Sequence, residues 1–196
     1  MEYTSIITTS YKEEEVISLR NILKERYKKN SLNINSDYIY TITPLDLKIL
    51  FKLYDEIFLK DFFKLKNLDI KFSVSKRLEK VAGKTIFKQL HKNIMIKEDK
   101  NTKIKGEVKT LIKEDYEIRI GIRFFIEFNK YNHNSKVCGI TVVDSLEALL
   151  LVFEHELCHL LEFYIFKTSS CKKKQFKNIS TNLFKHRGIY HELKVV

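Results

Sequence analysis

The feature that most constrains the fold is a long apolar segment, residues 146–166, which contains neither glycine nor proline. Asp144 and Glu147 precede or begin it with a spacing that resembles a capping box. The segment is apolar almost all round, which is typical of a helix buried in a protein core. Its glutamates would be costly in lipid, so we expect a core helix and not a membrane span.

Within this segment lies the sequence His155-Glu156-Leu157-Cys158-His159. On a helix, residues four apart lie on one face about 6 Å apart, so His155 and His159 would present two imidazoles to one ion. Zinc favours imidazole nitrogen and lowers the pKa of bound water to about 7. Glu156 lies where its carboxylate can take a proton from that water. The pattern is typical of a zinc peptidase, with Zn²⁺ as the cofactor.

The alternative interpretation of the segment is a plain core helix whose histidines are satisfied by hydrogen bonds. A buried helix that carries His155, His159 and several carboxylates must pair or ligate each of these polar groups. We therefore favour a metal site over this alternative.

A catalytic zinc site usually has three protein ligands, so one ligand must come from another part of the chain. We favour His186 over His191 as this third ligand. The carboxylate alternatives are Glu162 and Glu192, and Glu162 is better suited to orient a ligand from outside the coordination shell.

The net charge of +11 is concentrated in residues 76–92 and 167–196. Such clusters favour polyanionic partners, nucleic acid first, although a solvated surface of a lysine-rich chain is the alternative. The candidate nucleic-acid-binding residues are Lys76, Arg77, Lys84, Lys172, Lys173 and Lys174.

The three cysteines, Cys138, Cys158 and Cys171, form no C-x-x-C pair, and an odd number suggests a reducing compartment. The first residues contain neither a basic segment nor the apolar run of a signal peptide. We therefore expect an intracellular protein of the cytoplasm or nucleus, without a transmembrane segment.

Hydrophobic periodicity predicts the remaining helices. Thr43 and Pro44 start a helix that we expect to run to about residue 63. An earlier helix ends near residue 29. We expect residues 1–42 to form an N-terminal helical extension and linker, and residues 43–196 to form the main domain.

Alternating apolar residues predict strands at residues 68–74 and 116–128, and residues 81–87 are a third candidate. Gly83 within the third candidate indicates a bulge or a close backbone approach. We therefore expect an α+β fold with helices packed around a small sheet of about three strands.

Several of these stretches together resemble the SprT-like metalloprotease family, which includes Spartan. The resemblance covers about residues 44–196 and is carried by Tyr54-Asp55-Glu56-Ile57-Phe58, Phe72-Ser73-Val74-Ser75-Lys76-Arg77-Leu78, Ala82-Gly83, His155 to His159, and His186-Arg187-Gly188-Ile189-Tyr190. The last stretch is similar to the family's third-histidine region, with the glycine displaced by one position and tyrosine in place of phenylalanine, and it favours His186 over His191.

The resemblance implies a zincin-like metalloprotease domain with zinc held by His155, His159 and His186 and with Glu156 as the catalytic base. Spartan-type members cleave proteins crosslinked to DNA and are activated by DNA, so it also implies DNA as a partner. The family often carries a zinc ribbon after the catalytic core, whereas this chain has no cysteine pairs. DNA binding would therefore depend on the basic surface and on residues 1–42.

We therefore expect a zinc-dependent metalloprotease that acts on DNA-bound or DNA-crosslinked proteins in DNA repair. One alternative is a nucleic-acid-binding module with a structural zinc, closed by four protein ligands. Glu156 argues against it, because a structural site needs no base. A second alternative is a general intracellular metallopeptidase without DNA dependence.

Overall fold

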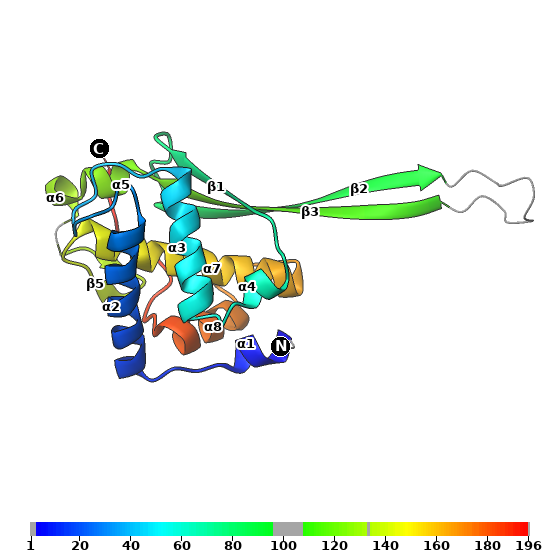
Figure 1. The fold of residues 1–196 in the computed structure, drawn as a ribbon, viewed down its shortest axis with the longest axis horizontal. Coiled ribbons are helices and arrows are strands. Elements are labelled where there is room, and N and C mark those ends of the chain that lie inside the picture. Colours follow the sequence, from blue (N-terminus) through cyan, green and yellow to red (C-terminus); the bar gives the residue numbers. More distant parts are fainter. Residues whose placement is uncertain (1–2, 96–107, 133, 196) are drawn as a thin grey trace, which may run out of the picture.

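The computed structural model describes residues 3–95, 108–132 and 134–195, which form a mixed α+β fold (Figure 1). The helices are α1 Tyr3–Thr8, α2 Glu13–Asn30, α3 Pro44–Ile57, α4 Phe62–Leu65, α5 Arg123–Ile126, α6 Phe128–Tyr131, α7 Ser145–Phe166 and α8 Lys174–Phe184. The strands are β1 Ile70–Ser75, β2 Gly83–Met95, β3 Val108–Gly121, β4 Lys136–Val137 and β5 Ile140–Thr141. The predicted α+β class with a small three-stranded sheet is confirmed.

Helix α7 runs through the centre of the protein and is buried along most of its length. The Asp144 side chain accepts a hydrogen bond from the Glu147 backbone N–H at 2.7 Å and caps the start of the helix. The helix ends where Lys167 adopts a left-handed conformation, with φ of 57°. None of the helices in the described part of the chain has the length and apolar character needed to cross a bilayer.

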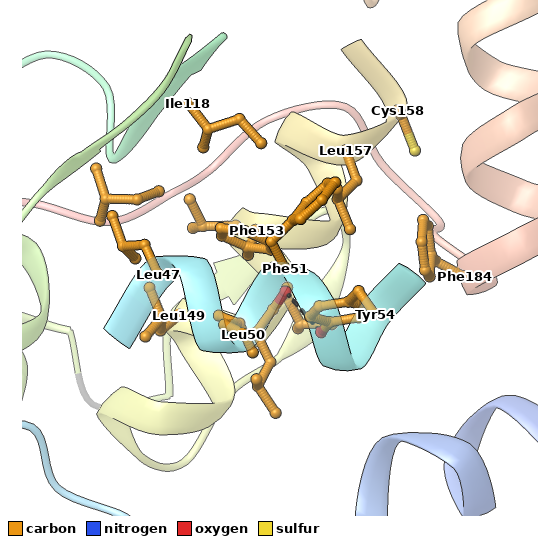
Figure 2. Packing of buried hydrophobic residues seen from close by; sticks show 14 of the residues in the cluster. Leu47, Leu50, Phe51, Tyr54, Ile118, Leu149, Phe153, Leu157, Cys158 and Phe184 are labelled. Carbon is orange, nitrogen blue, oxygen red and sulfur yellow. Dashed lines mark hydrogen bonds between the residues drawn. The ribbon is translucent and has the colours of Figure 1, made fainter. Parts of the chain in front are cut away.

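Helix α3 packs directly against α7 and forms the centre of the core (Figure 2). Leu50 and Tyr54 of α3 are fully buried there, and the Tyr54 ring stacks on Phe153 of α7 with centroids 5.7 Å apart. The helix ends at Ile57, earlier than predicted, because the Asp55 carboxylate turns to accept hydrogen bonds from the backbone of the next helix, α4.

Helix α2, which lies within the predicted extension of residues 1–42, packs beside α3. Its residues Val16, Leu23 and Tyr27 are buried in the same core as α3 and α7. The N-terminal segment therefore contributes to the core that supports α7.

The main sheet has the order β1-β3-β2, with β1 parallel and β2 antiparallel to β3. Strands β2 and β3 continue beyond β1 as a long two-stranded ribbon that extends away from the helices (Figure 1). The predicted strand at 116–128 ends at Gly121, because Phe124, Phe125 and Phe128 bury their rings at helical spacing instead. Strand β2 is an edge strand, and its first residues lie next to α7.

Candidate metal centre

Helix α7 brings the two histidines of the motif together, as the spacing predicts. The Nε2 atoms of His155 and His159 lie 3.1 Å apart, and the ring of Phe176 packs against both imidazoles. Two nitrogen ligands on a tetrahedral zinc, at Zn–N distances of about 2.0–2.1 Å, lie about 3.3 Å apart. The pair therefore has a separation that fits chelation of one ion.

His191 is the further histidine that the fold places beside this pair. Its ring centroid lies 4.4 Å from that of His155. Its Nε2 atom is buried and has no hydrogen-bond partner among the described residues, which is costly unless another group binds it. One ligand atom from each of Cys138, His155 and His191 lies within 4.8 Å of the others, so these three form a candidate metal-binding group among the described residues, and His159 is not a member of it.

Backbone pairing with the segment before α7 positions His191. Val137 of β4 forms an antiparallel bridge with His191, and the Cys138 N–H donates to the Tyr190 carbonyl at 2.8 Å. On the other side, the Glu192 N–H donates to the Lys136 carbonyl at 2.9 Å. The residues before and after His191 are thus both hydrogen-bonded to β4 or its neighbour.

His186, the ligand favoured from the sequence, lies in a different environment. Its side chain is completely buried, and its Nε2 atom lies 2.9 Å from Oε2 of Glu154. A carboxylate accepts hydrogen bonds only, so Nε2 carries the hydrogen. The other ring nitrogen, Nδ1, is buried and has no hydrogen-bond partner among the described residues, but His186 is not a member of the group formed by Cys138, His155 and His191. The structure therefore places His191, and not His186, in the candidate metal-binding group.

Cys138 contacts the other side of the His155 ring. Its Sγ atom lies 3.6 Å from Nδ1 of His155, whereas Nε2 of the same ring faces His159. The two ring nitrogens point in opposite directions, so Cys138 is suited to orient His155 and not to share an ion with both Nε2 atoms. Burial raises the pKa of the Cys138 thiol, which favours the neutral thiol.

His159 is oriented through a short chain of hydrogen bonds. Ser169 Oγ donates to Glu162 Oε2 at 2.5 Å, so it accepts from Nδ1 of His159, which lies 2.6 Å away. This arrangement fixes the hydrogen on Nδ1 and leaves the Nε2 lone pair facing His155. Glu162 thus acts on His159 from a distance, in agreement with the sequence-based preference for an orienting role.

All three imidazoles of the site are held in the neutral form that binds metals. Burial lowers the pKa of His159 to about 4 and that of His191 to about 3. Burial and the neighbouring histidines also lower the pKa of His155 far below its usual value. Neutral imidazole nitrogens are suited to bind a cation such as Zn²⁺.

Glu156 is buried between α7 and the edge strand β2. Its Oε2 atom lies 2.7 Å from the Thr85 hydroxyl, and burial raises the pKa of Glu156 to about 7 although the bonds from Thr85 lower it. A Cβ atom on Gly83 would lie 2.8 Å from Oε1 of Glu156, so β2 can approach only because residue 83 is glycine. The close backbone approach predicted at Gly83 is confirmed.

These groups open into a cleft of about 550 Å³. The cleft is lined by Gly83, Lys84 and Thr85 of β2 and by residues after α7 and α8. His155, Glu156, His159 and His191 also line it. The arrangement brings a candidate metal site and a carboxylate with a raised pKa into one solvent-connected space.

The candidate nucleic-acid-binding residues are all exposed, but they lie on different elements. Lys84 lines the cleft, whereas Lys76 and Arg77 follow β1. Lys172, Lys173 and Lys174 come directly after Cys171, which also lines the cleft. Basic side chains therefore occur near two of the elements that border the cleft.

No family model, curated protein or solved structure matches the chain. Three residues of the site were not among the sequence-based candidates: Thr85, Cys138 and Ser169. No motif marks them, because each reaches the site through contacts between segments far apart in the sequence. Gly83 was the one sequence signal that indicated the approach of β2.

Proposed function

We propose that the protein is a zinc-dependent metallopeptidase in which His155, His159 and His191 bind the metal and Glu156 is the catalytic base. The observation that carries this proposal is the pair of Nε2 atoms 3.1 Å apart beside a buried carboxylate in one cleft. A zincin-like fold and kinship with the SprT-like proteases are part of the same proposal. The motif helix and the small sheet beside it support both.

Zn²⁺ bound here would supply a Lewis acid that polarises a peptide carbonyl and lowers the pKa of water. Glu156 accepts a proton from the attacking water and then donates it to the leaving amine. A carboxyl group with a pKa of about 7 is suited to both transfers at neutral pH. Thr85 holds this carboxyl group at the edge of the cleft.

The edge strand β2 supports a peptide as the substrate. One side of β2 pairs with β3, and the described residues place no strand on its other side, next to the cleft. An extended peptide can add to such an edge through main-chain hydrogen bonds. Its backbone would then lie beside Glu156 and the histidines.

Within this proposal we assign DNA-bound or DNA-crosslinked proteins as the substrates and DNA repair as the context. The support is the charge of +11 and the exposed lysines near the cleft. Lys84 lines the cleft, and Lys172 to Lys174 follow one of its lining residues. A peptidase that binds DNA through this surface would meet the proteins attached to that DNA.

A nucleic-acid-binding module with a structural metal is the second candidate. Its support is the contact of Cys138 with the histidines, because structural zinc sites use thiolates. Against it, Cys138 faces Nδ1 of His155, and burial raises the pKa of its thiol. A closed structural site also gives no role to the buried Glu156.

The test is cleavage of a basic DNA-binding protein by the wild type and by Glu156→Gln, with zinc content measured on both. We expect the variant to bind one zinc per chain and to lose cleavage by at least about 10²-fold, the size of a general-base effect. His159→Ala is the matched control that should lose the metal as well. Cleavage by Glu156→Gln at the wild-type rate would contradict the mechanism.

The same assay, run with and without single-stranded DNA, separates the alternatives. Cleavage that requires DNA supports DNA-bound proteins as the substrates. Equal cleavage in both conditions supports a general metallopeptidase. Bound zinc without cleavage in either condition supports the binding module.

A further inference from the structure

Next to the first metal-binding histidine lies a buried carboxylate whose four hydrogen-bond positions are all filled. Oε1 of Glu154 accepts from Arg20 Nε at 2.7 Å and from the Tyr54 hydroxyl at 3.1 Å. Oε2 accepts from Arg20 Nη2 at 2.8 Å and from His186 Nε2 at 2.9 Å. A carboxylate offers about four acceptor positions, so Glu154 is saturated without any solvent.

This network joins three segments that are far apart in the sequence. Arg20 belongs to α2, Glu154 to α7, and His186 to the segment that follows α8. Arg20 also donates to the Phe184 carbonyl at 2.8 Å, so it binds the end of α8 directly. Helix α2 is therefore attached to the residues that lead to His191.

The segment from His186 to Glu192 contains no helix or regular strand, and its position depends on its attachments. At its start, the side chain of His186 is bound to Glu154. Directly after it, the N–H groups of Arg187 and Gly188 donate to the Cys138 carbonyl at 2.9 and 2.8 Å. At its end, Glu192 is bound to Lys136, so His191 lies between fixed points.

We propose that His186 is a positioning residue, whose bond to Glu154 fixes the segment that presents His191 to the metal. Arg20 of α2 contributes by binding and orienting the Glu154 carboxylate. The inference rests on the proposed metal site of His155, His159 and His191. It gives His186 and helix α2 a role in metal binding, although neither would contact the metal.

The geometry explains why this attachment acts on the metal site. Glu154 directly precedes His155, so the same turn of α7 carries the first ligand and the group that holds the third ligand's segment. Loss of the His186 bond leaves Glu154 with Arg20 and Tyr54, so its charge stays paired. The segment, in contrast, loses its side-chain anchor at the first residue.

The experiment measures Zn²⁺ affinity by competition with a chelator and records the absorption spectrum of the Co²⁺-loaded protein. The variants are His186→Leu, which removes the donor, and His186→Gln, whose amide can still donate to Glu154. We expect His186→Leu to bind zinc about 10–100-fold more weakly, the usual effect of losing a group that orients a ligand. His186→Gln should restore most of the affinity and the wild-type cobalt spectrum.

Leu23→Ala is the matched control for a general loss of stability. Leu23 is fully buried on α2, the helix of Arg20, and its hydrocarbon side chain cannot form a hydrogen bond to Glu154. We expect this variant to unfold at a lower temperature and to bind zinc like the wild type. A loss of zinc affinity in Leu23→Ala equal to that of His186→Leu would overturn the positioning role.

Two further outcomes would overturn the inference. His186→Leu that binds zinc as tightly as the wild type shows that the anchor has no effect on the metal. If both His186 variants lose zinc while His191→Ala keeps it, His186 is itself the ligand. A wild-type protein that binds no zinc contradicts the proposed function as well, so the two failures can be told apart.

Discussion

The Glu156 carboxyl group fits beside β2 only because residue 83 has no side chain. A Cβ atom there would lie 2.8 Å from Oε1 of Glu156 and 2.9 Å from Cγ1 of Val152, distances that real Cβ atoms do not tolerate. We expect Gly83→Ala to displace Glu156 and to reduce peptide cleavage at least about 10-fold, because a misplaced catalytic group loses much of its effect. The histidines should keep their zinc. The measurement is the cleavage rate at saturating zinc, together with zinc content. Unchanged cleavage would show that Glu156 can move without consequence. At the same scale, the local spacing of His155, Glu156 and His159 was enough to predict them as site residues. The third metal ligand could not be chosen in this way, because the positions of His186 and His191 depend on hydrogen bonds to residues 136, 138 and 154, which are distant in the sequence.

At the scale of elements, the C-terminal end of α7 is joined to β3 by a group of polar side chains. Lys167 Nζ lies 2.7 Å from Oε2 of Glu114, and the Tyr116 hydroxyl donates to the same oxygen at 2.6 Å. Burial alone would raise the pKa of Glu114, but the bonds from Lys167, Tyr116 and Gln89 lower it from 4.5 to about 2. Because the folded pKa is below the unfolded value, this group stabilises the fold above pH 4.5, and the contribution is lost as the pH falls through about 2. We expect Glu114→Gln to be less stable than the wild type near neutral pH and to lose less stability between pH 5 and pH 2. Urea unfolding across that range measures the difference, and identical pH profiles would contradict it. The sequence predicted the elements best where a cap marks the start, as at Thr43 and Asp144. It did not predict the length of the β2–β3 ribbon, since the outer residues show no strict alternation of apolar and polar types and are fixed by pairing with each other.

At the scale of the whole molecule, the chain combines a core built around α7 with a strongly basic surface. The packing of α2 against this core could not be predicted from the sequence, because Arg20 and Glu154 are 134 residues apart and no local sequence pattern identifies them as partners. The basic surface, in contrast, was visible in the sequence, and its role can be tested by salt dependence. Each phosphate contact that is lost reduces the slope of log affinity against log salt by about 0.9 for duplex DNA. We therefore expect replacement of Lys172, Lys173 and Lys174 by glutamine to weaken duplex binding at low salt and to lower the slope by up to about 2.7. The matched control replaces three exposed lysines on α3 and α4, Lys48, Lys52 and Lys64, which removes the same charge from a different hollow of the surface. An equal effect in both triple variants would show that only the total charge matters. If the wild type does not bind DNA even at low salt, the lysines serve another purpose, and the cleft belongs to a peptidase that selects its substrates without DNA.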